Sequence, residues 1–291
     1  MTVYIYHGHG ASLKDAAILK FMFSMTLHPH GIPVKCFTET DLNAPSARWQ
    51  KDGDLIVFGG GEFTKVKERL SAYGRQAIID FAGRKSYLGI CKGGYAGAAQ
   101  IRFFGKDGAK TSDGFGFFNG VARGSLPIAP SLYTGKSDSA HIARFRHEKY
   151  GIEFPALYWG GPCFDMAENS LQHVQKLVTL QSCLSDKPIT MGIKVPVGEA
   201  GQAILLGYHA EATPPHIREW VLQFSDNTAD ITRILADMEA YESWKFYLGF
   251  ACMMDDLGLV KDHSFLGQIL QPQQTGKARD LDTSRPICKI A

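Results

Sequence analysis

The stretch that decides the fold lies at residues 87–95 and reads Tyr87-Leu-Gly-Ile-Cys91-Lys-Gly-Gly-Tyr95. Ser86–Ile90 has the composition of a strand, and small residues that favour a tight helix start follow at once. A strand that ends in Gly-x-Cys-x-Gly before a helix is the thiol form of a nucleophile elbow. Gly89 and Gly93 flank the cysteine because the tight turn leaves no room there for larger residues. The stretch therefore predicts a strand–turn–helix unit with a cysteine at its corner.

Strands and helices alternate on both sides of this unit. Strands are expected at Val3–Tyr6, Pro33–Phe37, Asp54–Phe58, Glu153–Tyr158, Lys176–Leu180 and Ala203–Gly207. Helical patterns cover Glu62–Ala82 and Pro214 to Phe224, and Ser12-Leu-Lys-Asp15 resembles a capping box. Residues 105–150 lack this periodicity and are expected to form hairpins or loops inserted into the sheet. The alternation indicates βαβ units and an α/β fold with a mostly parallel central sheet.

One large domain with an appendage fits the length of 291 residues, because single cores stop growing near about 250–300 residues. We expect a sheet domain over residues 1–224, a helical extension over 225–270 and an irregular tail over 271–291. An amphipathic pattern with a period near that of a helix starts at Thr228. The extension is expected to cap the sheet or to form an oligomer contact.

Composition and charge exclude several classes of protein. Lys and Arg number 31 against 29 Asp and Glu, an even balance that argues against a nucleic-acid or anionic-membrane binder. No apolar run reaches the roughly 18 residues that span a bilayer, and the N-terminus lacks the features of a secretory signal. The six cysteines are scattered without a CxxC pair, which favours reduced thiols. A cytoplasmic location is expected, although export by a non-classical route would leave no such signal.

A thiol nucleophile needs a base, and His209 is the best-placed histidine. It follows the strand 203–207, so it emerges at the same carboxyl-end edge of the sheet as Cys91. Glu211 could bond the far imidazole nitrogen, while N–H groups of Lys92 and of the loop at Gly60 could face a developing oxyanion. The alternatives are a buried cysteine that fills a corner, a solvated loop histidine and a glycine run that only turns the chain.

No metal and no cofactor is expected. His7-Gly-His9 and His28-Pro-His30 contain the right ligand type, but nothing in their spacing brings the pairs together, and structural zinc needs about four ligands. The glycine run 59–61 is not a phosphate-binding loop, because Lys65 has no preceding glycine and a valine follows it. Cys163 is expected in a loop, either packed toward solvent or facing the same site as Cys91.

Four blocks together resemble a class I glutamine amidotransferase-like domain, and more specifically the N-terminal domain of fungal-type biotin–protein ligases and their stand-alone bacterial relatives. The blocks are Val57-Phe-Gly-Gly-Gly61, Tyr87-Leu-Gly-Ile-Cys-Lys-Gly-Gly-Tyr-Ala-Gly97, Leu157-Tyr-Trp-Gly-Gly-Pro162 and Leu205-Leu-Gly-Tyr-His-Ala-Glu211. The resemblance covers residues 1–224 and leaves 225–291 outside it. It implies a flavodoxin-like three-layer sandwich with a C-terminal helical extension.

The resemblance also implies a Cys–His–Glu triad on Cys91, His209 and Glu211. Cys91 would attack an amide carbonyl, His209 would move the proton and Glu211 would orient the imidazole. The oxyanion- and substrate-binding residues that it implies are Gly60, Gly61, Lys92, Gly93, Tyr158 and Gly160. Two departures stand out: His-Ala-Glu replaces the usual His-Pro-Glu, and Lys92 stands where the family has small residues. Lys92 could favour the thiolate, contact an anionic substrate or block the pocket.

Two functions are therefore expected to compete. The first is a Cys-dependent amide hydrolase, or a glutaminase/amidotransferase-like enzyme, acting on a small-molecule or partner-linked amide. The second is a catalytically silent module that binds a ligand or regulates an unknown protein partner. The Cys hydrolase/chaperone branch of related folds is less favoured, because its elbow carries histidine directly after the cysteine, where Lys92 stands here. Biotin ligase activity, nucleic-acid binding and membrane binding are not expected, and a homo-oligomer through the C-terminal helix is a candidate assembly.

Overall fold

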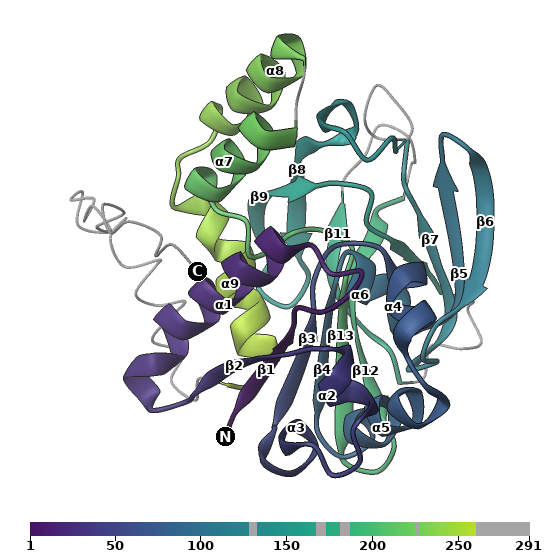
Figure 1. Ribbon diagram of the computed structural model, residues 1–291. Helices are drawn as coiled ribbons and strands as arrows, with labels where there is room; N and C mark the ends of the chain where they lie inside the picture. Colours follow the sequence, from purple (N-terminus) through teal and green to yellow (C-terminus); the bar gives the residue numbers. More distant parts are fainter. Residues whose placement is uncertain (128–132, 167–172, 181–186, 225–226, 260–291) are drawn as a thin grey trace.

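The computed structural model describes residues 1–127, 133–166, 173–180, 187–224 and 227–259 (Figure 1). Within these ranges a nine-stranded sheet crosses the molecule in the order β2-β1-β3-β4-β13-β12-β11-β8-β9. Its parallel half consists of β2 (Val34–Phe37), β1 (Val3–Tyr6), β3 (Leu55–Phe58), β4 (Ser86–Ile90) and β13 (Gly201–Leu206). Its antiparallel half consists of β12 (Ile189–Val197), β11 (Gln175–Leu180), β8 (His141–His147) and β9 (Ile152–Tyr158).

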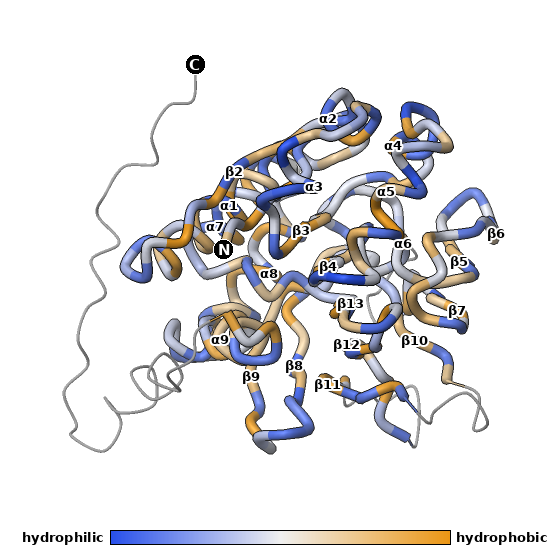
Figure 2. Tube along the Cα trace, turned by 90° about the horizontal axis from the view of Figure 1, so that it is seen from below, coloured by the Kyte–Doolittle hydropathy of each residue, from blue (hydrophilic) through white to orange (hydrophobic). Residues whose placement is uncertain are grey.

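Helices cover both faces of this sheet, as the view along the sheet shows (Figure 2). One face carries α1 (Leu13–Leu27), α7 (Pro214–Phe224), α8 (Thr228–Glu239) and α9 (Lys245–Asp256). The other carries α2 (Glu39–Asn43), α3 (Arg48–Asp52), α4 (Phe63–Arg69) and α5 (Ala72–Ala82). Within β1, Val3 and Ile5 belong to the first core while Tyr4 and Tyr6 belong to the second. Burial on both faces explains the uninterrupted apolar strands, and the predicted three-layer α/β fold is confirmed.

A smaller sheet packs beside the second core. It contains β10 (Cys163–Asp165), β7 (Phe118–Gly124), β5 (Ala98–Gly105) and β6 (Gly108–Asp113), in that order. The hairpin of β5 and β6 and the strand β7 account for part of the insertion expected at residues 105–150. The expectation that Cys163 lies in a loop and packs toward solvent is wrong. Cys163 begins β10 opposite Arg123 and is buried, and this burial raises the pKa of its thiol to about 11.

Two predicted helices are each divided in two. The helix expected over residues 62–82 ends at Arg69, and a new helix begins after Ser71, whose hydroxyl accepts the Gly74 N–H at 3.0 Å. The pattern that starts at Thr228 is likewise split into α8 and α9. The expected tail at 271–291 lies outside the described residues. No helix within the described ranges combines the length and the apolar character needed to cross a membrane.

Candidate active site

The elbow predicted from the sequence joins β4 to α6 (Lys92–Ala96), with Cys91 between them. Cys91 has φ 52° and ψ −107°, a conformation that is strained for a residue with a side chain. Its N–H donates to the Leu206 carbonyl at 2.9 Å, which ties the turn to β13. A Cβ on Gly93 would lie 1.9 Å from the Phe58 oxygen, and one on Gly89 would lie 2.2 Å from the Gly93 oxygen. Only glycine fits at these two positions while the strands keep their spacing.

The loop at Trp159 and Gly160 covers the thiol. Cys91 is 9% exposed, and its Sγ lies 3.7 Å from the Trp159 carbonyl oxygen. The Trp159 indole donates to the Lys136 carbonyl at 3.1 Å. The Tyr133 ring packs so closely on Gly160 that a Cβ there would lie 2.3 Å from it. Burial, followed by the charge of Cys91, raises the pKa of the Tyr133 hydroxyl to about 12. The thiol therefore sits in a nearly closed setting.

Next to this thiol lies a buried imidazole with two carboxyl groups. The backbone N–H of His209 donates to the Leu157 carbonyl at 2.9 Å, which fixes the loop after β13. His209 Nδ1 lies 2.7 Å from Glu211 Oε1 and 3.4 Å from Asp15 Oδ1. Asp15 comes from the first turn of α1, and its other oxygen accepts the Gly60 N–H. His209, Glu211 and Asp15 are 5%, 0% and 1% exposed, so water screens none of these interactions well.

The pKa values of the three groups depend on one another. Burial, and after it the negative charge of Asp15, raises the pKa of Glu211 to about 8. Burial acts in the same direction on Asp15, but hydrogen bonds from His209 and Glu211 outweigh it and lower the pKa of Asp15. Burial opposes protonation of His209, yet the charges of Glu211 and Cys91 and the bond to Asp15 raise its pKa well above the ordinary value. The arrangement favours an imidazolium beside Cys91.

Lys92, the departure from the family pattern, points into the protein. It is 2% exposed, its ammonium donates to the Gly10 carbonyl at 3.3 Å, and it lies 5.3 Å above the Tyr6 ring. Burial lowers the pKa of Lys92 to about 8, although the charges of Asp15 and Cys91 act against this. The side chain thus holds the loop that leads into α1. Its backbone N–H is at the first position of α6, where a helix offers no internal acceptor.

The remaining predicted site residues lie at the same edge of the sheet, where most of them form hydrogen bonds that stabilise the loops. The Gly60 N–H is bonded to Asp15, and Gly61 has φ 127° and packs against the Gly10 oxygen. The Tyr158 hydroxyl donates to the Gly161 carbonyl at 2.9 Å and accepts the Leu126 N–H at 2.7 Å. The Gly160 carbonyl accepts the Tyr95 hydroxyl at 3.0 Å. Each of these residues supports the turn geometry around Cys91.

Two residues of the site were not predicted from the sequence. Asp15 resembles a capping residue, and the Ser12 hydroxyl does accept its N–H at 3.3 Å, but its carboxylate turns to Gly60 and His209. Trp220 of α7 lies with its ring 5.3 Å from the His209 ring, nearly perpendicular to it. Spacing along α7 marks Trp220 only as one of its apolar residues.

Asp15, His209 and Glu211 each offer one atom within 4.8 Å of the others, so their suitability for a metal ion can be judged. The 2.7 Å between His209 Nδ1 and Glu211 Oε1 is a hydrogen-bond distance. Two ligands on one zinc ion, with bonds of about 2.0–2.2 Å, would stand roughly 3.3 Å apart. The described geometry fits a shared proton better than an ion. The histidine pairs at 7–9 and 28–30 are not part of this group.

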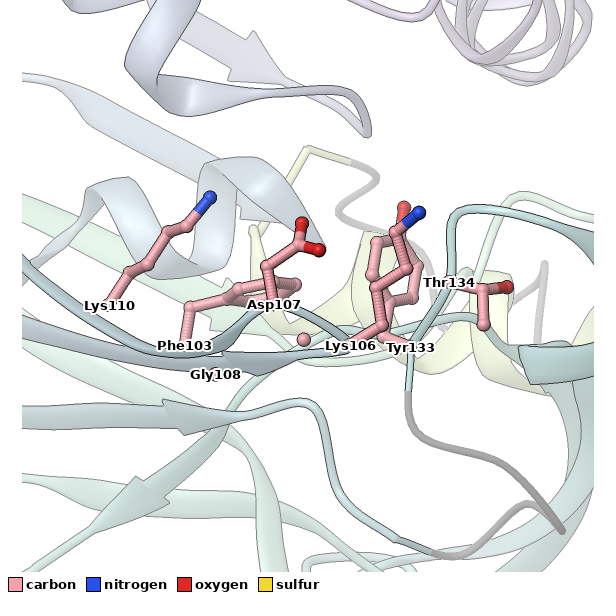
Figure 3. A pocket seen from close by; sticks show the side chains of 8 residues that line it. Phe103, Lys106, Asp107, Gly108, Lys110, Tyr133 and Thr134 are labelled. Atoms are coloured by element: carbon pink, nitrogen blue, oxygen red, sulfur yellow. The ribbon is translucent and has the colours of Figure 1, made fainter.

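A pocket of about 130 Å³ has the Tyr133 side chain in its lining (Figure 3). Its lining residues come from the β5–β6 hairpin and from residues 133–134, which lie between β7 and β8: Phe103, Gly105, Lys106, Asp107, Gly108, Lys110, Tyr133 and Thr134. The Phe103 and Tyr133 rings meet edge to face at 5.5 Å. Tyr133 therefore separates this pocket from the loop at Gly160.

The profile of the family described as biotin-protein ligase, N terminal, matches residues 1–269. The chain belongs to this family. The match runs past residue 224, where the resemblance was expected to end, and includes α8 and α9.

Two relatives are similar to this chain over part of their lengths. The chain is 28% identical over 170 residues to an uncharacterized protein of Chlamydia muridarum (strain MoPn / Nigg), an alignment of 57% of this chain and 63% of that protein. It is 28% identical over 219 residues to a biotin–protein ligase of Schizosaccharomyces pombe, an alignment of 72% of this chain and 33% of that ligase. The chain spans less than two thirds of either relative.

Solved structures with a similar arrangement are more distant. A ThuA-like protein of Bacteroides uniformis matches with a TM-score of 0.45 and 9% identity, over 82% of this chain and 89% of that one. The glutaminase domain of Trypanosoma brucei CTPS with bound acivicin matches with a TM-score of 0.41 and 10% identity, over 83% and 95%.

Proposed function

We propose that this member of the biotin–protein ligase N-terminal family is a Cys-dependent amide hydrolase of the glutaminase/amidotransferase type. One observation carries the proposal: Cys91 stands on a strained elbow beside His209, whose Nδ1 lies 2.7 Å from a fully buried Glu211. A nucleophile, a base and a group that orients the base are the parts that such a reaction requires. The substrate is a small-molecule amide or an amide carried by a partner.

The chemistry follows from these parts. The Cys91 sulfur attacks the amide carbonyl, and His209 donates a proton to the nitrogen as the carbon–nitrogen bond breaks and an amine or ammonia leaves. Water, activated by the then neutral His209, hydrolyses the thioester, which releases a carboxylic acid and restores the thiol. We assign the backbone N–H of Lys92 as the donor that stabilises the oxyanion, because the backbone N–H of Gly60 is already bonded to Asp15.

A catalytically silent module that binds a ligand is the second candidate. The observation in its favour is the enclosure of the thiol, which is only 9% exposed and lies against the Trp159 carbonyl. The pocket beside Tyr133 would then hold the ligand, and Cys91 would serve only to shape the elbow.

Turnover and thiol reactivity distinguish the two functions. We expect hydrolysis of glutamine or of a simple amide, measured as ammonia release, to fall at least about 10³-fold in Cys91→Ala. Cys36→Ser is the matched control, since Cys36 is a half-buried thiol on the distant edge strand β2, and it should retain full activity. Iodoacetamide labelling followed by peptide mapping compares both thiols in one sample, and Cys91 should react faster below pH 7.

The silent module is supported instead if no amide is hydrolysed and Cys91 reacts no faster than Cys36 at any pH between about 6 and 9. Full amidase activity in Cys91→Ala would show that another group carries the reaction and that the triad assignment is wrong.

A further inference from the structure

The arrangement around His209 contains one more carboxyl group than a Cys–His–Glu triad needs. Asp15 and Glu211 approach the same ring nitrogen from opposite ends of the chain, one from α1 and one from the loop after β13. The following inference concerns the same site and rests on the proposed function.

Both carboxyl groups are enclosed, in side chains that are 1% and 0% exposed for Asp15 and Glu211. Asp15 Oδ1 has only the long 3.4 Å contact with His209 Nδ1, and Glu211 Oε2 has no hydrogen-bond partner among the described residues. An oxygen of Asp15 and an oxygen of Glu211 lie within 4.8 Å of each other. Two carboxylates that are both ionised at this distance repel each other strongly where water is excluded. The imidazolium compensates one negative charge and the Lys92 ammonium is bonded to the Gly10 carbonyl, so the pair is most stable when one carboxyl group holds a proton.

We propose that Asp15 is a positioning residue of the active site that shares one proton with Glu211, so that either carboxyl group can serve as the anionic partner of His209. In the native protein Asp15 carries the charge, because it accepts the Gly60 N–H as well as facing the ring. Glu211 is the protonated member, in keeping with the rise of its pKa to about 8. The Nδ1–H of His209 then has an acceptor in every protonation state of the pair.

The ionisable groups that face the pair from neighbouring elements do not replace it. Cys91 and Lys92 act from the elbow, but Cys91 is the partner of the imidazolium and the Lys92 ammonium is bonded to Gly10. Tyr133 acts on His209 from the loop before β8, and Tyr208 acts on Glu211 from the loop after β13. Burial raises the pKa of both phenols far above neutrality, so both are uncharged at the pH of the experiment.

A shared proton makes the two carboxyl groups redundant, and that can be measured. If Asp15 becomes Asn, the negative charge that adds to burial in raising the pKa of Glu211 is removed, and we expect Glu211 to ionise against the His209 imidazolium. If Glu211 becomes Gln, Asp15 remains ionised. Each single variant therefore retains one negative charge beside His209, whereas the double variant Asp15→Asn/Glu211→Gln retains none. Asn and Gln have nearly the size of the side chains that they replace.

The test measures the protonation of His209 directly, by titrating the ring ¹⁵N signals of the full-length chain labelled with [¹⁵N]histidine. The His209 signals are identified by their loss in His209→Gln, and Asp80→Asn on the exposed side of α5 is the control. We expect each single variant to change the protonation constant of His209 by less than about 10-fold, and the double variant to lower it by at least about 100-fold.

A loss of 100-fold in Glu211→Gln alone, with no change in Asp15→Asn, would overturn the shared proton and leave Glu211 as the one partner of His209. A double variant that titrates like the native protein would overturn it as well. If the double variant does not fold, the single variants still decide between the two accounts. Failure of amide hydrolysis overturns the proposed function but leaves this titration unaffected, so the two failures are distinguishable.

Discussion

Gly93 shows at the scale of a single residue how closely the elbow is built. Its missing side chain lets the Phe58 carbonyl approach to within 1.9 Å of the place that a Cβ would take. Gly93→Ala must push α6 away from β3, so we expect a loss of about 1–3 kcal/mol in the free energy of unfolding. Urea denaturation measures this loss. Gly83→Ala is the control, because its Cβ would meet nothing closer than 3.5 Å, and its effect should stay within about 1 kcal/mol.

The residues at this corner differ in how far the sequence could predict them. The elbow motif predicts Cys91, and His209 follows from the carboxyl end of the strand at 203–207, which meets that of the elbow strand at one edge. Glu211 follows from its place two residues after His209. Asp15 was missed because a serine three residues before an acidic residue is also what a helix cap needs. The Ser12 N–H instead donates to the Gly60 carbonyl at 3.0 Å, which leaves the Asp15 carboxylate available for His209. Only the packing of α1 against the loop after β3 decides between the two roles.

At the scale of elements, the strands were easier to predict than the ends of the helices. An apolar strand buried on both faces leaves a clear pattern, and β1, β3 and β4 lie where this pattern places them. The breaks after α4 and after α8 fall within continuous amphipathic patterns, so periodicity does not reveal them. The second sheet could not be predicted as a unit, because β10 joins it from a distant part of the chain.

The helix α9, which lies in the segment expected to cap the sheet or to form an oligomer contact, packs into the same core as α1. Phe250 is completely buried, and its ring meets Phe23 edge to face at 5.6 Å. We therefore expect Phe250→Ala to lower the free energy of unfolding of the whole chain by about 3–5 kcal/mol. Leu222→Ala on α7, where the side chain is 59% exposed, should change it by less than about 0.5 kcal/mol. Urea unfolding followed by both fluorescence and circular dichroism measures this, and two separate transitions in the native chain would show that α9 belongs to an independent unit.

At the scale of the whole molecule, the buried carboxyl pair makes stability depend on pH. Glu211 keeps its proton up to about pH 8 in the folded chain but releases it near pH 4.5 when unfolded. Between these values the folded state binds more protons, so the free energy of unfolding falls as the pH rises. The raised pKa of His209 acts in the same direction above pH 6.5. The lowered pKa of Asp15 acts in the opposite direction, and only at pH values below about 3.8.

Burial lowers the pKa of His141 to about 4 and also lowers that of His216, so these two histidines act against this fall below about pH 6.5. We therefore expect the free energy of unfolding to decrease by on the order of 2 kcal/mol from about pH 6.5 to about pH 8, and Glu211→Gln to make the slope clearly less negative throughout the range from about pH 5 to about pH 8. Urea denaturation at intervals of about one pH unit gives the slope for both proteins. Glu153→Gln is the matched control, because this acidic residue is exposed on β9 and should leave the slope unchanged. The His209 contribution should remain in Glu211→Gln, so the slope should be reduced but not abolished. An identical slope in the native protein and in Glu211→Gln would mean that Glu211 is already ionised at pH 5, and a carboxylate in that state cannot share a proton with Asp15.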